Sequence, residues 1–510
     1  MHARDGINRR QFLAVSGASL LATQLGTGSQ KPQRDKPNIL LIIADQLVPF
    51  LTGVYGHPMV RTPNLDRLAK RGVRFDAAYT PCPICGPARA CLLTGKYSSE
   101  NGVYDNAAPL SCDEPTICHY LNRADYDTVL SGKAHFVGPD QLHGFRKRLI
   151  PSIYPTDFAW TKRRENKRPR SHARQYIGKA VRVGAKTRNL EFDENAHRRA
   201  MEYLGERGGS RDPFFLCVSY NFPHEPFCPP KRYWDMYEDA RIEIPQMPDD
   251  LDAKHSPMDK WLNRHHGVDR VDLQRPESLR RLRRAYYALI TYIDDKVGQL
   301  LESLEENGLA DDTVVIFTSD HGDMLCEKNM VQKRSFYEWS CRVPLIVAMP
   351  DGTGKGRRCG EPVSLIDLTP TILDLAGVEA SERLPMDGAS LLTLIRGEES
   401  GRRTVFAEMH SEGVYTTCFM VRRGRYKYNY LHGHGAQLFD LVEDPDEWND
   451  LAGEPQHAAV EAELRGLILR RFDPDAIEKD LRAGLKRRLL LKDAMEQTGV
   501  DWEYRPEPRR

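Results

Sequence analysis

A cysteine with a proline and an arginine close behind it is the residue set in this chain best suited to carry chemistry. Residues 85–89 read Cys-Gly-Pro-Ala-Arg, and Thr94 and Gly95 follow. Proline suits the first turn of a helix and glycine the position just past its end, so the spacing predicts a short helix from Pro87 to Gly95. Cys85 would then lie at the helix N-terminus, where free amide groups and the helix dipole favour a bound anion.

Cys85 also forms a C-x-x-C with Cys82, and this spacing has other interpretations. It occurs in redox-active pairs and in halves of metal sites. No second C-x-x-C follows at the spacing of a zinc site, and chains of the thioredoxin type are far shorter than 510 residues. A buried structural cysteine is the remaining alternative. The proline, the arginine and the Thr-Gly pair at their offsets favour a catalytic role for Cys85.

Polar residues follow three apolar runs at the point where each run ends. Asp45 and Gln46 follow the run at residues 38–44, and Asp320 and His321 follow the run at residues 313–318. Residues 221–224 follow the run at residues 214–220. Unbroken apolar runs are typical of strands buried on both faces of a parallel sheet. The carboxyl ends of such strands are where ligands bind in open α/β sheets. We therefore expect these polar residues to meet in one site.

The elements that must position this site alternate along the chain. A further apolar run covers residues 344–349, and helical patterns cover residues 65–71 and 276–307. Alternating strands and helices predict an α/β domain with a doubly wound, mostly parallel sheet, which we place at residues 37–400.

The pattern changes after residue 400. Residues 404–410 and 419–431 alternate polar and apolar side chains, as half-buried antiparallel strands do. We predict a small β-rich subdomain at residues 401–455 and a charged helical tail at residues 456–510. The tail could cover a neighbouring subunit in a homo-oligomer, or it could be a solvated amphipathic helix.

Residues 1–36 have the composition of an export signal. Arg9 and Arg10 precede an apolar stretch at residues 12–25 that is too short and too polar for a membrane-spanning helix. The pattern resembles a twin-arginine signal, which predicts an exported, periplasmic or extracellular protein without membrane insertion in its mature form. An arginine-rich tail without a targeting role is the alternative.

The overall charge excludes some classes of partner. Lys and Arg (73) nearly cancel Asp and Glu (72), so no global field favours nucleic acid or a membrane surface. An anionic substrate must therefore be attracted by a local site. The eleven cysteines are scattered through 510 residues, which does not resemble a disulfide framework.

The Cys-x-Pro-x-Arg pattern followed by Thr-Gly resembles the signature of the type I sulfatases, and the resemblance extends over nearly all of the chain from Pro37 onward. It implies an alkaline-phosphatase-like fold and hydrolysis of a sulfate ester to an alcohol and inorganic sulfate. It also implies that a maturation enzyme oxidises Cys85 to formylglycine (3-oxoalanine). One hydroxyl of the hydrated aldehyde would attack sulfur, and the second would allow sulfate to leave. Arg89 would serve maturation and hold the hydrate.

The resemblance also implies one divalent cation, bound by Asp45, Gln46, Asp320 and His321 together with residue 85. Carboxylate and amide oxygens suit Ca²⁺, Mg²⁺ or Mn²⁺. Many sulfatases have Asp-Asp at the first pair and Asn at the end of the second, where this chain has Gln46 and His321. Ca²⁺ is the expected ion with Mg²⁺ as an alternative, and the imidazole of His321 favours Mn²⁺ as the other.

Four further residues match motifs of the same family. Lys133 and His135 lie in a Gly-Lys-x-His, where the lysine would bind a sulfate oxygen and the histidine would help to open the hydrate. His224, in a Pro-His-x-Pro, would contact sulfate or the leaving oxygen. Lys333 occupies the position of a lysine that would donate a proton to the leaving group.

The substrate is less constrained than the reaction. Residues 130–145 and 153–160 most resemble those of choline sulfatases, which predicts choline sulfate. The likeness weakens after Trp160, where the basic residues 162–174 would suit a sulfated carbohydrate instead. A phosphonate monoester or phosphodiester hydrolase of the same superfamily is the nearest alternative function. A non-catalytic anion-binding protein on the same fold is a second.

Overall fold

The centre of the fold is a strand without a single exposed residue. The computed structural model describes residues 36–161, 172–238, 241–398, 401 and 403–502. Strand β1 (Asn38–Asp45) pairs in parallel with β5 (Phe214–Pro223) on one side and with β6 (Thr313–Ser319) on the other. All three are buried along their whole length, because their apolar runs are covered on both faces of the sheet. The predicted export signal, apart from Lys36, lies outside the described residues.

This main sheet contains both parallel and antiparallel strand pairs, and the antiparallel pairs lie on one side of it. Within the described residues its strand order is β4-β3-β5-β1-β6-β7-β2-β8, with β9 also paired to β2. Strand β7 runs antiparallel to both of its neighbours, β6 and β2. The predicted alkaline-phosphatase-like α/β fold with a mostly parallel sheet is confirmed. The additional strands are β2 (Val73–Tyr79), β3 (Asp127–Gly132), β4 (Lys147–Arg148), β7 (Arg342–Ala348), β8 (Arg357–Cys359) and β9 (Val363–Ser364).

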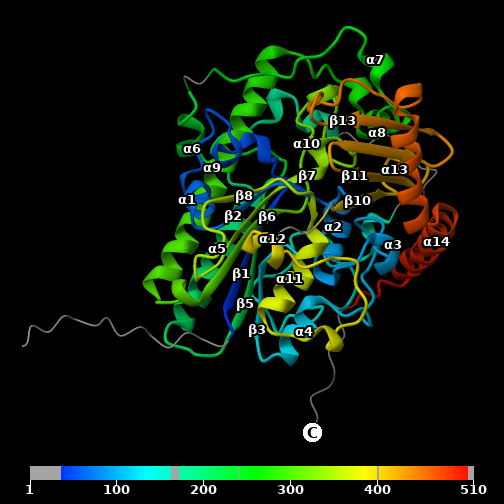
Figure 1. Ribbon diagram of the computed structural model, residues 1–510. Coiled ribbons are helices and arrows are strands. Elements are labelled where there is room, and N and C mark those ends of the chain that lie inside the picture. Colours follow the sequence, from blue (N-terminus) through cyan, green and yellow to red (C-terminus); the bar gives the residue numbers. More distant parts are fainter. Residues whose placement is uncertain (1–35, 162–171, 239–240, 399–400, 402, 503–510) are drawn as a thin grey trace, which may run out of the picture. The chain divides into compact units, whose positions relative to one another are not determined.

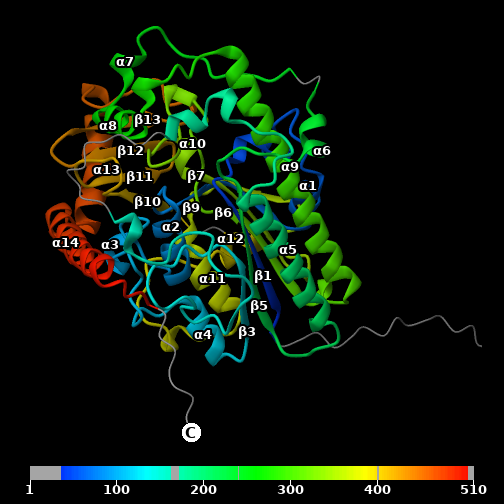
Figure 2. The same cartoon turned by 180° about the vertical axis from the view of Figure 1, so that it is seen from behind.

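Helices cover both faces of this sheet, and β1 shows the division. Leu40 and Ile42 pack in an apolar layer that contains α5 (Arg188–Arg207) and α9 (Pro276–Glu306). Their chain neighbours Ile39, Leu41 and Ile43 pack in a second layer on the opposite face. Successive side chains of a strand point to opposite faces, so one strand stabilises both layers. Figures 1 and 2 show the two groups of helices on either side of the sheet.

The other helices before residue 400 are shorter and lie in these layers or in the connections. They are α1 (Pro63–Arg71), α2 (Cys85–Thr94), α3 (Ser98–Asn101), α4 (Ile117–Arg123), α6 (Lys231–Asp235), α7 (Leu251–Lys254), α8 (Pro257–His266), α10 (Glu338–Cys341), α11 (Leu368–Leu375) and α12 (Leu392–Arg396). None of the helices in the described part of the chain combines the length and the apolar character that crossing a bilayer requires.

A second, antiparallel sheet follows in the C-terminal part. Its strands are β10 (Thr404–Met409), β11 (Cys418–Arg423), β12 (Tyr426–Leu431) and β13 (Gly435–Asp440), in that spatial order. Helix α13 (Ala458–Arg471) packs on one face of this sheet through Leu464 and Ile468. Helix α14 (Pro474–Thr498) then runs beside α3 (Figure 1). Both sheets belong to one structural unit that begins at Lys36.

Candidate active site

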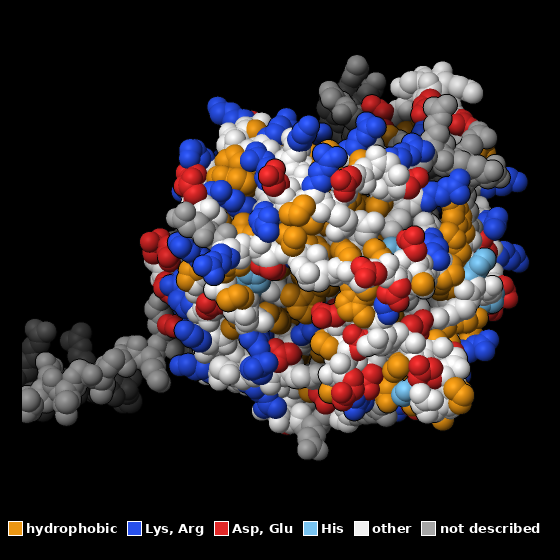
Figure 3. Space-filling model, turned by 90° about the horizontal axis from the view of Figure 1, so that it is seen from above, with side chains coloured by type: hydrophobic (Ala, Val, Ile, Leu, Met, Phe, Trp, Pro, Cys, Tyr) orange, Lys and Arg blue, Asp and Glu red, His pale blue; other side chains and the backbone are white. Residues whose placement is uncertain are grey.

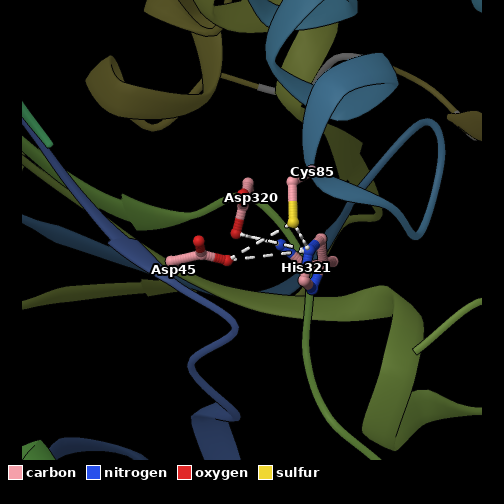
Figure 4. Close-up of side chains that lie close together, drawn as sticks. All are labelled: Asp45, Cys85, Asp320 and His321. Atoms are coloured by element: carbon pink, nitrogen blue, oxygen red, sulfur yellow. Dashed lines mark hydrogen bonds and ion pairs between the residues drawn. The ribbon is translucent and has the colours of Figure 1, made fainter. Parts of the chain in front are cut away.

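The expected site lies at the carboxyl edge of the main sheet. Asp45 is the last residue of β1, Asp320 and His321 come directly after β6, and Cys85 is the first residue of α2. One ligand atom from each of the four lies within 4.8 Å of the others, and all four side chains are buried. Figure 4 shows them converging from three elements.

Helix α2 begins two residues earlier than the proline spacing predicts, so Cys85 lies inside its first turn. The helix ends as predicted at Gly95, which adopts a left-handed conformation (φ 70°) that glycine tolerates. The amide of Gly86, in this first turn, donates to Oδ1 of Asn106 at 2.8 Å and is therefore not free for an anion. The start of α2 is therefore fixed by the loop that carries Asn106.

The four ligand atoms fit one metal ion. Donors bound to Ca²⁺ at 2.3–2.6 Å can be at most about 5 Å apart, and these satisfy that limit. His321 Nδ1 lies 2.9 Å from the Gly322 carbonyl, which makes it the protonated nitrogen and leaves Nε2 facing the cluster. Burial lowers the pKa of His321 to about 3, so its imidazole is neutral and able to bind a metal. The described residues therefore hold a suitable donor set, with Nε2 of His321 3.1 Å from the sulfur of Cys85.

Two cationic side chains neutralise the carboxylates of the cluster. The ammonium of Lys133 forms an ion pair with Asp45. Arg89 donates from Nε to Asp320 at 2.9 Å and from Nη1 to Ser219 Oγ at 2.7 Å. Burial opposes the positive charge of Lys133 and lowers its pKa to about 7. The paired charges explain how two carboxylates can be buried together.

Tyr154 and Trp160 form an aromatic wall beside Lys133 and His135. The ring of Tyr154 stacks on the imidazole of His135 with 5.0 Å between centroids, and the ammonium of Lys133 lies 4.5 Å from the same ring. Trp160 packs against both Tyr154 and His135. Burial, then the charge of Lys133, holds the pKa of His135 well below its ordinary value. The sequence identified residues 153–160 only as a stretch of resemblance, so the aromatic side chains were missed as site residues.

His224 and Lys333 meet on another side of Gln46. Lys333 donates to Oε1 of Gln46, and its Nζ lies 2.9 Å from Nε2 of His224. Burial, then the charge of Lys333, holds the pKa of His224 well below its usual value, so this imidazole is neutral. Lys333 also acts electrostatically on the thiol of Cys85, whose pKa burial raises to about 11. The structure thus brings the predicted residues into one neighbourhood, and their roles remain predictions.

Lys333 is carried by a loop with an unusual backbone. Between β6 and α10, six non-glycine residues have positive φ: Leu325, Cys326, Lys328, Asn329, Gln332 and Arg334. Such a conformation costs about 1 kcal/mol or more per residue, so the surroundings must hold it. Glu412 forms an ion pair with Arg334 at 2.7 Å, and Lys427 in β12 donates to the carbonyl of Phe336 at 2.8 Å. The C-terminal sheet therefore stabilises the loop that presents Lys333.

Helix α14 also reaches loops near the site. Arg488 donates to both carboxylate oxygens of the buried Asp105 at 2.6 and 2.7 Å, next to the Asn106 that holds Gly86. Lys492 donates to the carbonyls of Ala159 and Thr161, on either side of Trp160. The predicted tail thus packs on its own chain through these contacts, and coverage of a neighbouring subunit stays a prediction.

Comparisons with known proteins show which families and structures the chain is similar to. Residues 37–378 match a family model described as "Sulfatase", and residues 326–472 match one described as "N-sulphoglucosamine sulphohydrolase, C-terminal". A choline-sulfatase of Rhizobium meliloti (strain 1021) is 38% identical over 92% of this chain and 94% of its own length. An arylsulfatase of Clostridium perfringens is 30% identical over 86% of this chain and 95% of its own. The solved structure of a phosphonate monoester hydrolase from Silicibacter pomeroyi superposes with a TM-score of 0.70 at 26% identity, covering 86% of this chain and 95% of that one.

Proposed function

Because this chain belongs to the sulfatase family and is a sulfuric ester hydrolase, we propose that it uses a formylglycine made from Cys85 beside one divalent cation. The observation that carries the proposal is the cluster of Asp45, Cys85, Asp320 and His321 within 4.8 Å. In this cluster, the oxygens of the aldehyde hydrate would take the place of the sulfur of Cys85. When formed, the hydrate supplies a nucleophilic oxygen and a second hydroxyl for product release; when bound, the cation supplies polarisation of sulfate oxygens.

The protein's own side chains orient the sulfate and move a proton. Lys133 and Arg89, already paired with Asp45 and Asp320, present positive charge where the sulfate oxygens must lie. Lys333, which lies beside the neutral His224, would donate a proton to the leaving alkoxide. The cation expected from the sequence is Ca²⁺, and we propose Mn²⁺ as the main alternative because a neutral imidazole completes the donor set.

We propose choline sulfate as the first substrate to test, with a sulfated carbohydrate second. The half-buried Trp160 packs against Tyr154 and His135 beside the site, and aromatic faces attract a quaternary ammonium. The relative named a choline-sulfatase supports the same choice. Figure 3 shows basic and acidic side chains intermixed over one face of the molecule. The basic residues 162–171 lie outside the described residues.

The aromatic wall gives a prediction that uses a matched pair of esters. Choline sulfate and its neutral isostere 3,3-dimethylbutyl sulfate differ only in the charge at the end of the alcohol. We expect kcat/KM to favour choline sulfate by about 2- to 30-fold, from a cation–π attraction of about 0.5–2 kcal/mol. Trp160→Ala should remove most of that preference. Equal kcat/KM for both esters in the wild-type protein, or a higher value for a sulfated monosaccharide, would refute choline sulfate as the substrate.

A phosphodiester hydrolase is the competing function, because both reactions transfer a tetrahedral anion and the fold is shared with a phosphonate monoester hydrolase. Side-by-side kinetics on 4-nitrophenyl sulfate and bis(4-nitrophenyl) phosphate separate the two. We expect a higher kcat/KM on the sulfate monoester. A higher kcat/KM on the diester would overturn the assignment to sulfate ester hydrolysis.

A further inference from the structure

The two ends of the Gln46 side-chain amide lie in different surroundings. Its oxygen, Oε1, accepts a hydrogen bond from Lys333 on the side of the proposed catalytic residues. Its nitrogen, Nε2, points into a group of buried acceptors. These are Glu225 Oε2 at 3.0 Å, the hydroxyl of Tyr176 at 3.2 Å, and a carboxylate oxygen of Asp323. Gln46 and Asp323 are fully buried, and Tyr176 and Glu225 are nearly so.

The side-chain amide of Gln46 has fewer hydrogens than neighbouring acceptors. A side-chain amide has two N–H groups. The hydroxyl of Tyr176 donates its own hydrogen to Asp323 Oδ2 at 2.7 Å. A hydroxyl that donates can still accept, but Nε2 of Gln46 lies closer to the carboxylate oxygens of Glu225 and Asp323 than to this hydroxyl, so we assign its two hydrogens to the carboxylates.

Each carboxylate also accepts a hydrogen bond on its other oxygen. The other oxygen of Glu225 accepts a hydrogen bond from the side-chain amide of Gln332. The other oxygen of Asp323 accepts one from the backbone N–H of Leu325 at 2.9 Å. Without a donor at position 46, Glu225 Oε2 would lose its hydrogen bond from the amide and Asp323 Oδ2 would keep only the one from Tyr176, and loss of a partner by a buried acceptor is costly.

We propose that Glu225, Asp323 and Tyr176 are positioning residues that hold the amide of Gln46 in one orientation, with Oε1 toward the cation. This rests on the proposed function, in which Gln46 supplies that oxygen as a ligand. It also explains why this chain has glutamine where many sulfatases have aspartate. A carboxylate at position 46 would have no hydrogen to donate, and it would join a pair in which burial, then the charge of Glu225, already raises the pKa of Asp323 to about 7.

The test exchanges the amide of Gln46 and the carboxylate of Asp323, through Gln46→Glu, Asp323→Asn and the double variant. In chelator-treated full-length protein, Mn²⁺ affinity is measured by titration calorimetry, with the thermal midpoint recorded for each variant. We expect Gln46→Glu to weaken Mn²⁺ binding about tenfold or more, although it adds a charged ligand. Asp323→Asn alone should also weaken it, because the new amide faces the amide of Gln46. In the double variant the introduced amide can donate to the introduced carboxylate, so the affinity should return to within about threefold of wild type.

The alternative gives the opposite pattern. If Gln46 acts only as a ligand, Gln46→Glu should bind Mn²⁺ as tightly as wild type or more tightly. Adding Asp323→Asn to that variant should then not raise its Mn²⁺ affinity. Either result overturns the proposal. Should Gln46→Glu fail to fold, Tyr176→Phe decides, since loss of the hydroxyl should weaken Mn²⁺ binding about tenfold and an unchanged affinity refutes the proposal. Wild-type protein that binds neither Mn²⁺ nor Ca²⁺ would instead refute the metal site of the proposed function.

Discussion

Replacing Cys85 with alanine is expected to reduce turnover by about 10⁴-fold or more while the protein stays folded. Of the four side chains in the cluster, Cys85 is the one that the proposed mechanism converts to the nucleophile, and removal of a nucleophile has effects of this size. Its sulfur contacts His321 and Asp45 but makes no hydrogen bond to the backbone among those observed. The measurement is kcat on a chromogenic sulfate ester together with the thermal midpoint.

Cys91 supplies the matched control in the same helix. It is as buried as Cys85, and its sulfur lies 3.4 Å from the hydroxyl of Ser98, away from the cluster. Cys91→Ala should therefore keep turnover within a few-fold of wild type, apart from any general loss of stability. Turnover near the wild-type rate in Cys85→Ala would contradict the assignment of the nucleophile.

Replacing Asp320 with alanine is expected to destroy both activity and much of the stability. Asp320 accepts hydrogen bonds from Arg89 Nε at 2.9 Å, from the backbone N–H of Gln46 at 3.1 Å and from that of His321 at 3.0 Å. Its removal leaves the buried guanidinium of Arg89 without this carboxylate, and breaking such a buried pair costs about 3–5 kcal/mol. Chemical denaturation would show the loss in the free energy of unfolding, and kinetics would show the loss of turnover.

A partly exposed ion pair provides the comparison. Asp76 pairs with Arg74 at 2.7 Å and with Arg358 at 2.9 Å, where solvent reaches all three side chains, so Asp76→Ala should cost about 1 kcal/mol or less. Cys85→Ala and Asp320→Ala should both be inactive, but only the second should be strongly destabilised. An Asp320→Ala protein with the wild-type free energy of unfolding would show that the ion pair with Arg89 does not hold the site together.

The sheet and the ends of its strands could be predicted from the sequence because burial leaves a direct pattern. The unbroken apolar runs identified β1, β5 and β6, and parallel strands end at a common edge, which places Asp45 near Asp320. The position of Cys85 beside them needed the family resemblance, since nothing in the spacing alone relates α2 to that edge.

Other parts of the site had no such signal. Positive φ at Leu325, Lys328 or Arg334 is not encoded by glycine, so the loop that presents Lys333 could not be read from residue types. The contact between Arg488 and Asp105 joins residues 383 apart in the chain. The polar network behind Gln46 likewise gathers side chains from separate segments, and only tertiary structure shows why that position is a glutamine.

The proposed mechanism requires that residue 85 is formylglycine, and not cysteine, in the active protein. Peptide mass spectrometry of natively produced, active protein measures the chemical state of this residue directly, on the fragment that contains Cys85. We predict a fragment lighter than the cysteine form by the difference between a CH2SH group and a CHO group, about 18 Da. A fragment that carries only the intact thiol in fully active protein would contradict the mechanism.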